Sequence, residues 1–144
     1  MKKRFLFPMI GLACWIIFIF TRSLQPANLS TMESQWVLDL IHAILPFDIS
    51  MHFVRKAAHF TEFAVLGCLA RLAFGQRFQG WLSSFLFAVI TGVVVALCDE
   101  TIQLFVSGRT GQIQDIWLDT AGAFTGVVIT TTVFRFLTQC SKKH

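Results

Sequence analysis

The sequence WLSSFLFAVITGVVVALC, which runs from Trp81 to Cys98, contains no charged residue. A transmembrane helix needs about 17–25 predominantly apolar residues, so this stretch is long enough to cross the hydrocarbon core of a bilayer. The tryptophan at its start is typical of the membrane–water interface. We therefore predict a transmembrane helix here and, including the polar residues that follow it, place the span at residues 81–104.

The composition of the whole chain has the same membrane character. Of its 144 residues, 55% are hydrophobic and 14% are charged, and the mean hydropathy is +0.66. A soluble domain is about 25% charged, so this chain has too few charges to cover a water-facing surface. The same composition excludes disordered, collagen-like and disulfide-rich secreted chains. The length predicts one membrane domain comprising residues 1–144.

Three further apolar stretches predict spans at residues 5–21, 57–74 and 116–134. The first follows a basic cluster, as the apolar region of a signal peptide does. No small-residue cleavage site comes after it, so we expect an uncleaved helix. The second contains His59, Glu62 and Arg71, which lower its hydropathy. Its assignment therefore depends on the topology.

The positions of the basic residues indicate the topology, because cytoplasmic loops carry an excess of Lys and Arg. Three spans would separate the basic N-terminus from the basic C-terminal tail, whereas four spans place both on one side, with a turn at residues 71–77. The inner side then holds Lys2, Lys3, Arg4, Arg71, Arg77, Arg135, Lys142 and Lys143, and the outer side holds Arg22, Arg55, Lys56 and Arg109. The prediction is an all-α integral membrane protein with four transmembrane helices and both termini in the cytoplasm.

A fifth helix is predicted in the first external loop. Ser30 and Glu33 have the spacing of a capping box, which indicates a helix start at Ser30. Apolar residues then recur at helical spacing until Pro46: Trp36, Val37, Leu40, Ile41, Ile44 and Leu45. This pattern predicts an amphipathic helix lying along the outer surface, either packed against the bundle or in contact with lipid.

The net charge of +4 does not indicate a nucleic-acid-binding protein. The basic residues lie at the ends of apolar stretches, where topology signals lie, and they form no basic face that could follow phosphates. The four cysteines suggest no disulfide framework, and we expect them to be small buried hydrophobic residues.

The ionisable residues are concentrated at the predicted outer ends of the spans. These residues, with one glutamine, are Arg55, Lys56, His59, Glu62, Asp99, Glu100, Gln103, Arg109, Asp115 and Asp119. Spacings of three and four residues place His59 and Glu62 on one helix stripe. Asp119 shares a stripe with Gly122 and Gly126, and small residues allow helices to pack closely, so we expect Asp119 to face protein. The sequence therefore predicts one polar pocket on the outer side of the membrane.

The residue types in this pocket suggest two kinds of site. A histidine can act as general acid or base, carboxylates can hold a divalent cation, and an arginine can bind a phosphate. The candidate functional, including catalytic, residues are His59, Glu62, Asp99, Glu100, Arg109 and Asp115, and the candidate ligand-binding residues are Arg55, Lys56, Gln103 and Asp119. The sequence identifies no particular metal or cofactor. A purely structural alternative is an ion-pair clamp that joins Arg55 or Arg109 to Glu62 and the aspartates.

Three segments carry a resemblance to a known family. The segment RKAAHFTEF at residues 55–63 resembles the R-K-x-x-H-F-x-E-[YF] segment of VanZ-like membrane proteins. DETIQLF at residues 99–105, followed by Gly108-Arg109 and Asp115, is similar to the family's D-E-x-x-Q-x-F…G-R…D segment. Ser23-Leu-Gln-Pro is similar to its S-x-Q-P element. The ordered match covers about residues 5–135.

The sequence departs from this pattern at three positions. Asp119 replaces the usual Asn, Phe63 the common Tyr, and Ser107 a frequent Pro. The resemblance implies a multi-pass protein of the bacterial plasma membrane and cell envelope, because the name-giving member is associated with resistance to the antibiotic teicoplanin. The expected partner is a membrane lipid, a lipid-linked envelope component or a lipoglycopeptide. The expected function is binding or modulating such a molecule; the alternatives are a membrane-embedded, metal-assisted enzyme acting on a lipid head group and, less favoured, a transporter.

Overall fold

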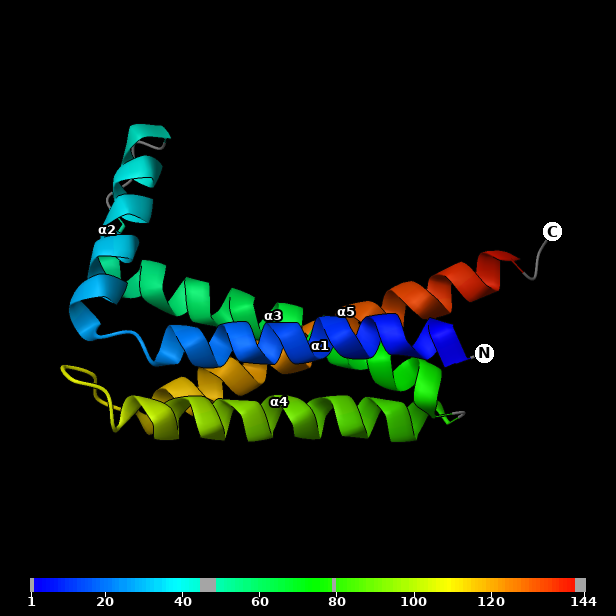
Figure 1. The fold of residues 1–144 in the computed structure, drawn as a ribbon. Helices are drawn as coiled ribbons and strands as arrows, with labels where there is room; N and C mark the ends of the chain where they lie inside the picture. Colours follow the sequence, from blue (N-terminus) through cyan, green and yellow to red (C-terminus); the bar gives the residue numbers. More distant parts are fainter. Residues whose placement is uncertain (1, 45–48, 79, 142–144) are drawn as a thin grey trace.

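A computed structural model describes residues 2–44, 49–78 and 80–141 of the chain, and within these residues it contains five helices and no strand. The helices are α1 (Lys2–Ser23), α2 (Ala27–Ile44), α3 (Met51–Arg77), α4 (Trp81–Gln103) and α5 (Ile113–Ser141) (Figure 1). Four of them, α1, α3, α4 and α5, are long and apolar enough to cross a membrane. The predicted all-α membrane fold with four spans is confirmed.

The four long helices lie side by side, and α2 projects from one end of the bundle, across the direction of the others (Figure 1). The beginning of α1 and the end of α5 lie together at the opposite end. Helix α3 contacts all four other helices. Its polar residues lowered its hydropathy in the sequence, and the structure shows why they are tolerated: this is the central helix, and they face protein.

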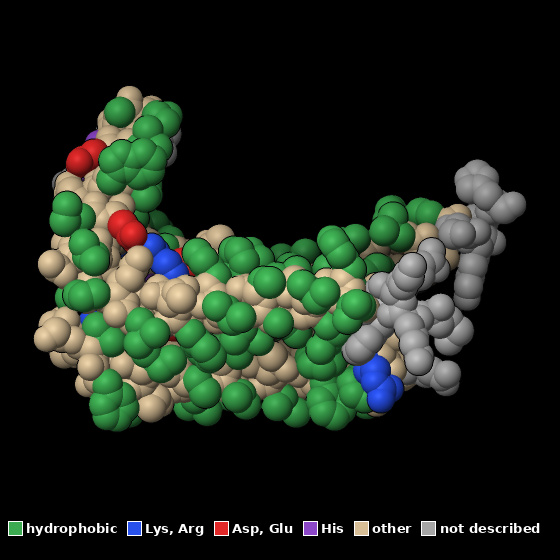
Figure 2. Space-filling view, viewed as in Figure 1, with side chains coloured by type: hydrophobic (Ala, Val, Ile, Leu, Met, Phe, Trp, Pro, Cys, Tyr) green, Lys and Arg blue, Asp and Glu red, His purple; other side chains and the backbone are tan. Residues whose placement is uncertain are grey.

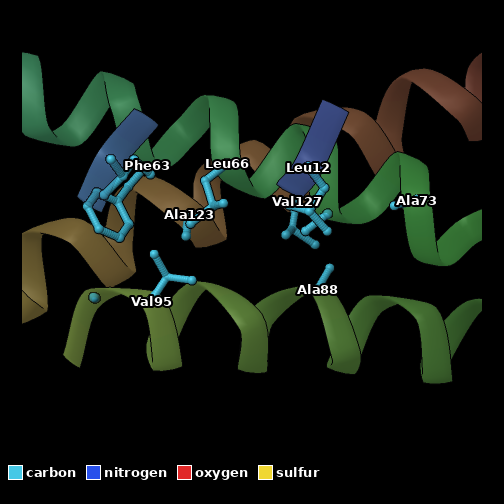
Figure 3. Packing of buried hydrophobic residues seen from close by; sticks show 11 residues of the cluster. Leu12, Phe63, Leu66, Ala73, Ala88, Val95, Ala123 and Val127 are labelled. Carbon is cyan, nitrogen blue, oxygen red and sulfur yellow. The ribbon is translucent and has the colours of Figure 1, made fainter. Parts of the chain in front are cut away.

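The core of the bundle is made of small and medium-sized apolar side chains. Phe63 and Leu66 of α3 point toward Val95 of α4 and Ala123 and Val127 of α5 (Figure 3). Larger apolar side chains cover the outside of the bundle along its length, as Figure 2 shows for one face, and charged side chains lie near its ends. This distribution suits a protein that is surrounded by lipid. Cys14, Cys98 and Cys140 are exposed on this surface, so the expectation that the cysteines are buried was wrong for them.

Glycines set the distance between α3 and α5. A Cβ atom on Gly126 would collide with the backbone carbonyl of Ala64, and one on Gly67 would collide with that of Ala123. On Gly122 a Cβ atom would lie 2.5 Å from the carbonyl oxygen of Phe60. The predicted glycine stripe on α5 therefore faces the bundle interior, and it allows the backbones of the two helices to touch.

Two local predictions were wrong. The α2 helix begins at Ala27 rather than Ser30, because the carbonyl of Pro26 already accepts the amides of Leu29 and Ser30. Leu45 and Pro46 lie outside the described residues, and the amphipathic role of α2 stays a prediction. Arg71 does not belong to a turn: α3 continues to Arg77, and the buried Arg71 donates from Nε to Oγ1 of Thr131 on α5 at 2.9 Å.

Candidate functional site

The predicted polar residues come together where α2 meets the bundle, around two small cavities. We call the larger one, of about 110 Å³, the basic cavity. Its polar lining consists of His52, Arg55, Lys56 and His59 of α3, Gln103 of α4, Arg109, Thr110 and Gln112 of the loop before α5, and Asp115 of α5. The sequence predicted most of these residues as one pocket, since they lie at helix ends that share one side of the bundle.

A second space, of about 30 Å³, lies deeper and is called the inner cavity. Its polar lining consists of Arg22, Ser23, Ser30, Ser34, Arg55, His59, Glu62, Asp99 and Arg109. Three residues, Arg55, His59 and Arg109, line both cavities. Instead of the single pocket expected, the structure has two adjoining cavities, and Glu62 lies at the inner one whereas Asp115 lies at the other.

The loop at residues 104–112 carries Arg109 into both cavities. Gly108 adopts a φ of 76°, which a glycine reaches without steric cost, and this conformation turns the chain just before Arg109. The carbonyl of Ser107 accepts the amide of Ala27 at 3.4 Å, and the amide of Gln112 donates to the Glu100 carboxylate at 2.7 Å. The loop is therefore fastened on both sides of Arg109.

Glu100 and Asp119 line neither cavity. Glu100 was a candidate functional residue, but its buried carboxylate lies behind the cavities and accepts the Gln112 amide. Through this hydrogen bond Glu100 holds the loop before α5 in place. Asp119 was a candidate ligand-binding residue and is fully buried, with His59 Nδ1 3.8 Å from one carboxylate oxygen.

The ion pairs differ from the clamp that the sequence suggested. Lys56 pairs with Asp115 at 3.1 Å. Arg22 at the end of α1 pairs with Glu33 of α2 and lies 3.8 Å from Glu62. Within residues 2–44, 49–78 and 80–141, neither Arg55 nor Arg109 forms an ion pair with a carboxylate.

Arg109 is therefore a cation that forms no ion pair with any described residue. Its Nε lies buried with no hydrogen-bond partner among the described residues. Burial, together with the neighbouring positive charge of Arg55, lowers the pKa of the Arg109 guanidinium. An anion placed between the two guanidinium groups would relieve both effects.

Asp99 lies at the centre of a hydrogen-bonded group at the inner cavity. Ser23 of α1 donates its hydroxyl to one carboxylate oxygen, and Gln103 donates to the other from 2.8 Å. Gln103 was predicted to bind a ligand, and the structure places it both at the basic cavity and on Asp99.

An apolar groove of about 480 Å³ adjoins the inner cavity and opens between α1, α2 and α3. Figure 2 shows the molecule hollowed at this corner, with acidic and basic side chains at its base. Its apolar walls come from Trp15 and Phe18 of α1, Val37 and Ile41 of α2, and Ile49, Phe53, Val54, Ala57, Ala58 and Val65 around α3. The groove and the inner cavity share Arg22, Ser34, Ala58 and Glu62, so the apolar and polar spaces adjoin at these residues.

Sequence reasoning missed several contributors to this site, among them Arg22, Ser23 and Glu33. Arg22 was counted only as a topology signal, and Glu33 only as half of a capping box. Ser23 belongs to the S-x-Q-P element, which was the available signal, since a hydroxyl at the end of an apolar helix can meet the polar ends of neighbouring helices. Their roles depend on α1 and α2 packing beside α3.

Comparison with known proteins identifies the family of the chain. The family model that matches is VanZ/LLP1, and it matches residues 8–135. No curated protein and no solved structure matches the chain. The matched region contains Ser23, Arg55, His59, Asp99 and Arg109, which meet at the two cavities. The chain belongs to the VanZ/LLP1 family of proteins.

Proposed function

We propose that the protein binds a phosphate-bearing amphiphile of the bacterial envelope, either a phospholipid or a lipid-linked precursor. Its phosphate would lie between Arg55 and Arg109, which line both cavities, and its chain in the apolar groove that adjoins the inner cavity. The observation that carries this proposal is that Arg55 and Arg109 both line the two cavities and form no ion pair with a carboxylate of the described residues. Guanidinium groups bind phosphate oxygens through paired, charge-assisted hydrogen bonds.

The groove supports the amphiphilic part of the proposal. Its walls are almost entirely apolar, and it leads directly to Arg22 and Glu62 at the inner cavity. Helix α2 leaves the bundle sideways and exposes Met32, Trp36 and Leu40. A helix in this orientation can lie in the membrane interface, beside lipid head groups.

We place the protein in the bacterial plasma membrane, with both termini in the cytoplasm and the cavities on the outer side. The common end of α1 and α5, opposite the cavities, supports this topology, as does the excess of basic residues at that end. Binding an envelope lipid, a lipid-linked precursor or a lipoglycopeptide at the outer face would alter how a drug such as teicoplanin reaches its target.

A reporter fusion tests the topology. We expect green fluorescent protein fused after His144 to fluoresce, because it folds in the cytoplasm, and alkaline phosphatase at the same position to be inactive. The same two reporters inserted after Gly108 should give the reverse result, since this loop is placed on the outer side. An active phosphatase at His144 would place the cavities on the cytoplasmic side and contradict this topology.

A binding measurement tests the proposed function. Full-length protein in detergent micelles is mixed with phosphatidic acid, a polyprenyl phosphate, a diacylglycerol with the same chains, or inorganic phosphate, and bound molecules are counted by native mass spectrometry. We expect the two lipid phosphates to bind at least about tenfold more tightly than the diacylglycerol, because one hydrogen bond to a charged group contributes about 1.5 kcal/mol or more. We expect inorganic phosphate to bind weakly, because it gains nothing from the groove. Equal binding of diacylglycerol and phosphatidic acid would contradict the proposal.

An enzyme acting on a lipid head group is a second candidate function, and His59 favours it. His59 lines both cavities and lies beside two buried carboxylates, Asp99 and Asp119. The binding measurement separates the two functions: lipid phosphates recovered unchanged after long incubation support binding alone, whereas loss of the phosphate or of the head group supports an enzyme.

A further inference from the structure

One imidazole and two carboxylates from three different helices converge beside the inner cavity. His59 of α3, Asp99 of α4 and Asp119 of α5 each offer one donor atom, and these three atoms lie within 4.8 Å of one another. The helices bring them together from positions 40 and 20 residues apart in the chain, so the arrangement is a product of packing. A group of this size can hold one metal ion once the side chains move slightly inward to metal–ligand distances of about 2.0–2.2 Å.

Asp119 is the strongest indication that this group binds something. The residue is 0% exposed, and neither carboxylate oxygen has a hydrogen-bond partner among the described residues. Nδ1 of His59, 3.8 Å away, is also buried without a partner. The carboxylates of Asp99, Glu100, Asp115 and Glu62 repel a charge on Asp119. A buried carboxylate is either protonated or paired with a cation or a metal ion, so a positively charged partner would stabilise the ionised form of Asp119.

The surroundings of Asp99 resemble the outer shell of a metal site. Asp99 is 2% exposed, and its two oxygens accept hydrogen bonds from Ser23 and Gln103. These donors fix the orientation of the carboxylate and leave further lone pairs on both oxygens. Hydrogen bonds of this kind hold the ligands of metal sites in position.

We propose that His59, Asp99 and Asp119 bind one divalent transition-metal cation of the zinc or manganese type. Mg²⁺ and Ca²⁺ prefer oxygen ligands alone, whereas a nitrogen ligand combined with carboxylates suits first-row transition metals. Two carboxylates and one neutral imidazole carry two negative charges, which balance a divalent cation. The proposal does not rest on lipid binding.

A cation bound at this site would lie beside the inner cavity. His59 and Asp99 line the inner cavity, and Asp119 lies behind them. Three protein ligands leave at least one coordination position for water or another oxygen ligand, as in catalytic zinc sites. Because His59 and Asp99 both line the inner cavity, a phosphate oxygen that enters this cavity is a candidate for that position.

A metal titration without added lipid tests the proposal. The full-length protein in detergent is stripped with a chelator, dialysed and titrated with Zn²⁺, Mn²⁺ or Mg²⁺ by calorimetry, and the bound metal is counted by elemental analysis. We expect the unchanged protein to bind one Zn²⁺ per chain. Asp119→Asn and His59→Gln should each lower the Zn²⁺ affinity at least about tenfold, which is the lower limit of the loss when an outer-shell partner is removed. Mg²⁺ should bind much more weakly than Zn²⁺.

The matched control is Asp39→Asn, because Asp39 is an exposed α2 residue that contacts Gln35. This variant keeps the exposed cysteines and should bind Zn²⁺ as the unchanged protein does. Thermal unfolding checks the fold: Zn²⁺ should raise the Tm of the unchanged protein and of Asp39→Asn but not that of Asp119→Asn. If Asp119→Asn does not fold, His59→Gln carries the test. Equal Zn²⁺ affinity in the unchanged protein and the site variant, or Mg²⁺ binding as tightly as Zn²⁺, overturns the proposal.

Discussion

Replacing Arg109 with glutamine is expected to weaken the binding of phosphatidic acid by about 10- to 100-fold, because a hydrogen bond to a charged group contributes about 1.5–3 kcal/mol. Glutamine is shorter and neutral, so the substitution removes one of the two guanidinium groups that line both cavities. Folding should be unaffected, because within the described residues Arg109 forms no ion pair and its Nε has no partner. The affinity is measured by native mass spectrometry, and the fold by thermal unfolding in the same detergent.

The control for this variant is Arg77→Gln. Arg77 lies at the far end of α3, and its exposed guanidinium lies over the Phe78 ring, 5.8 Å from the ring centre. A neutral residue there changes the net charge by the same amount but leaves the cavities unchanged. Equal losses of affinity in the two variants would show that only overall charge matters. A fall in Tm for Arg109→Gln that accounts for the lost binding would show that Arg109 is structural.

Replacing Gly126 with alanine should destabilise the bundle by about 3 kcal/mol or more, at or above the upper end of what an extra group in a packed core costs. The added Cβ atom collides with the Ala64 carbonyl, which belongs to the α3 backbone and has no rotamer to change. The two helices must separate, and His59 on α3 and Asp119 on α5 would move apart with them. Unfolding is followed by circular dichroism as denaturing detergent is added to mixed micelles.

Gly11→Ala is the matched control, because a Cβ atom on Gly11 would have its nearest neighbour at 3.9 Å, an ordinary contact with Leu69. This substitution should leave stability unchanged or raise it slightly, since alanine favours a helix more than glycine does. Equal effects of the two substitutions would mean that the close approach of α3 and α5 at Gly126 does not stabilise the bundle.

Much of the fold could be predicted from single segments. The uncharged run at residues 81–98 predicts α4 by itself. The basic residues at both ends of the chain require an even number of spans, which predicts α3 as a span despite His59 and Glu62. The stripe of Gly122 and Gly126 correctly predicts which face of α5 is buried. These predictions succeed because hydropathy and helical periodicity are local properties of the chain.

Errors arose where a hydrogen bond overrides the pattern of residue types. The topology predicts that Arg71 belongs to a cytoplasmic turn, yet Arg71 lies within α3 and Thr131 on another helix accepts its hydrogen bond. Ser30 was read as a helix cap, but the carbonyl of Pro26 begins the helix one turn earlier. In both cases the hydrogen-bond partner, Thr131 or Pro26, lies outside the stretch of sequence on which the prediction was based.

The amino-acid sequence alone determines that this chain is a four-span helical membrane protein and that its acidic residues gather at one end, because burying apolar surface in lipid and keeping charges near water depend on residue order. Only the tertiary structure decides which charges are paired. Arg22 pairs with Glu33 and Glu62, and Lys56 pairs with Asp115. The Glu100 carboxylate accepts the Gln112 amide of the loop. Among the described residues, Arg55 and Arg109 line the cavities without an ion pair, and Asp119 is buried beside His59. Helix rotation and packing distance fix these partners, which sequence spacing leaves open.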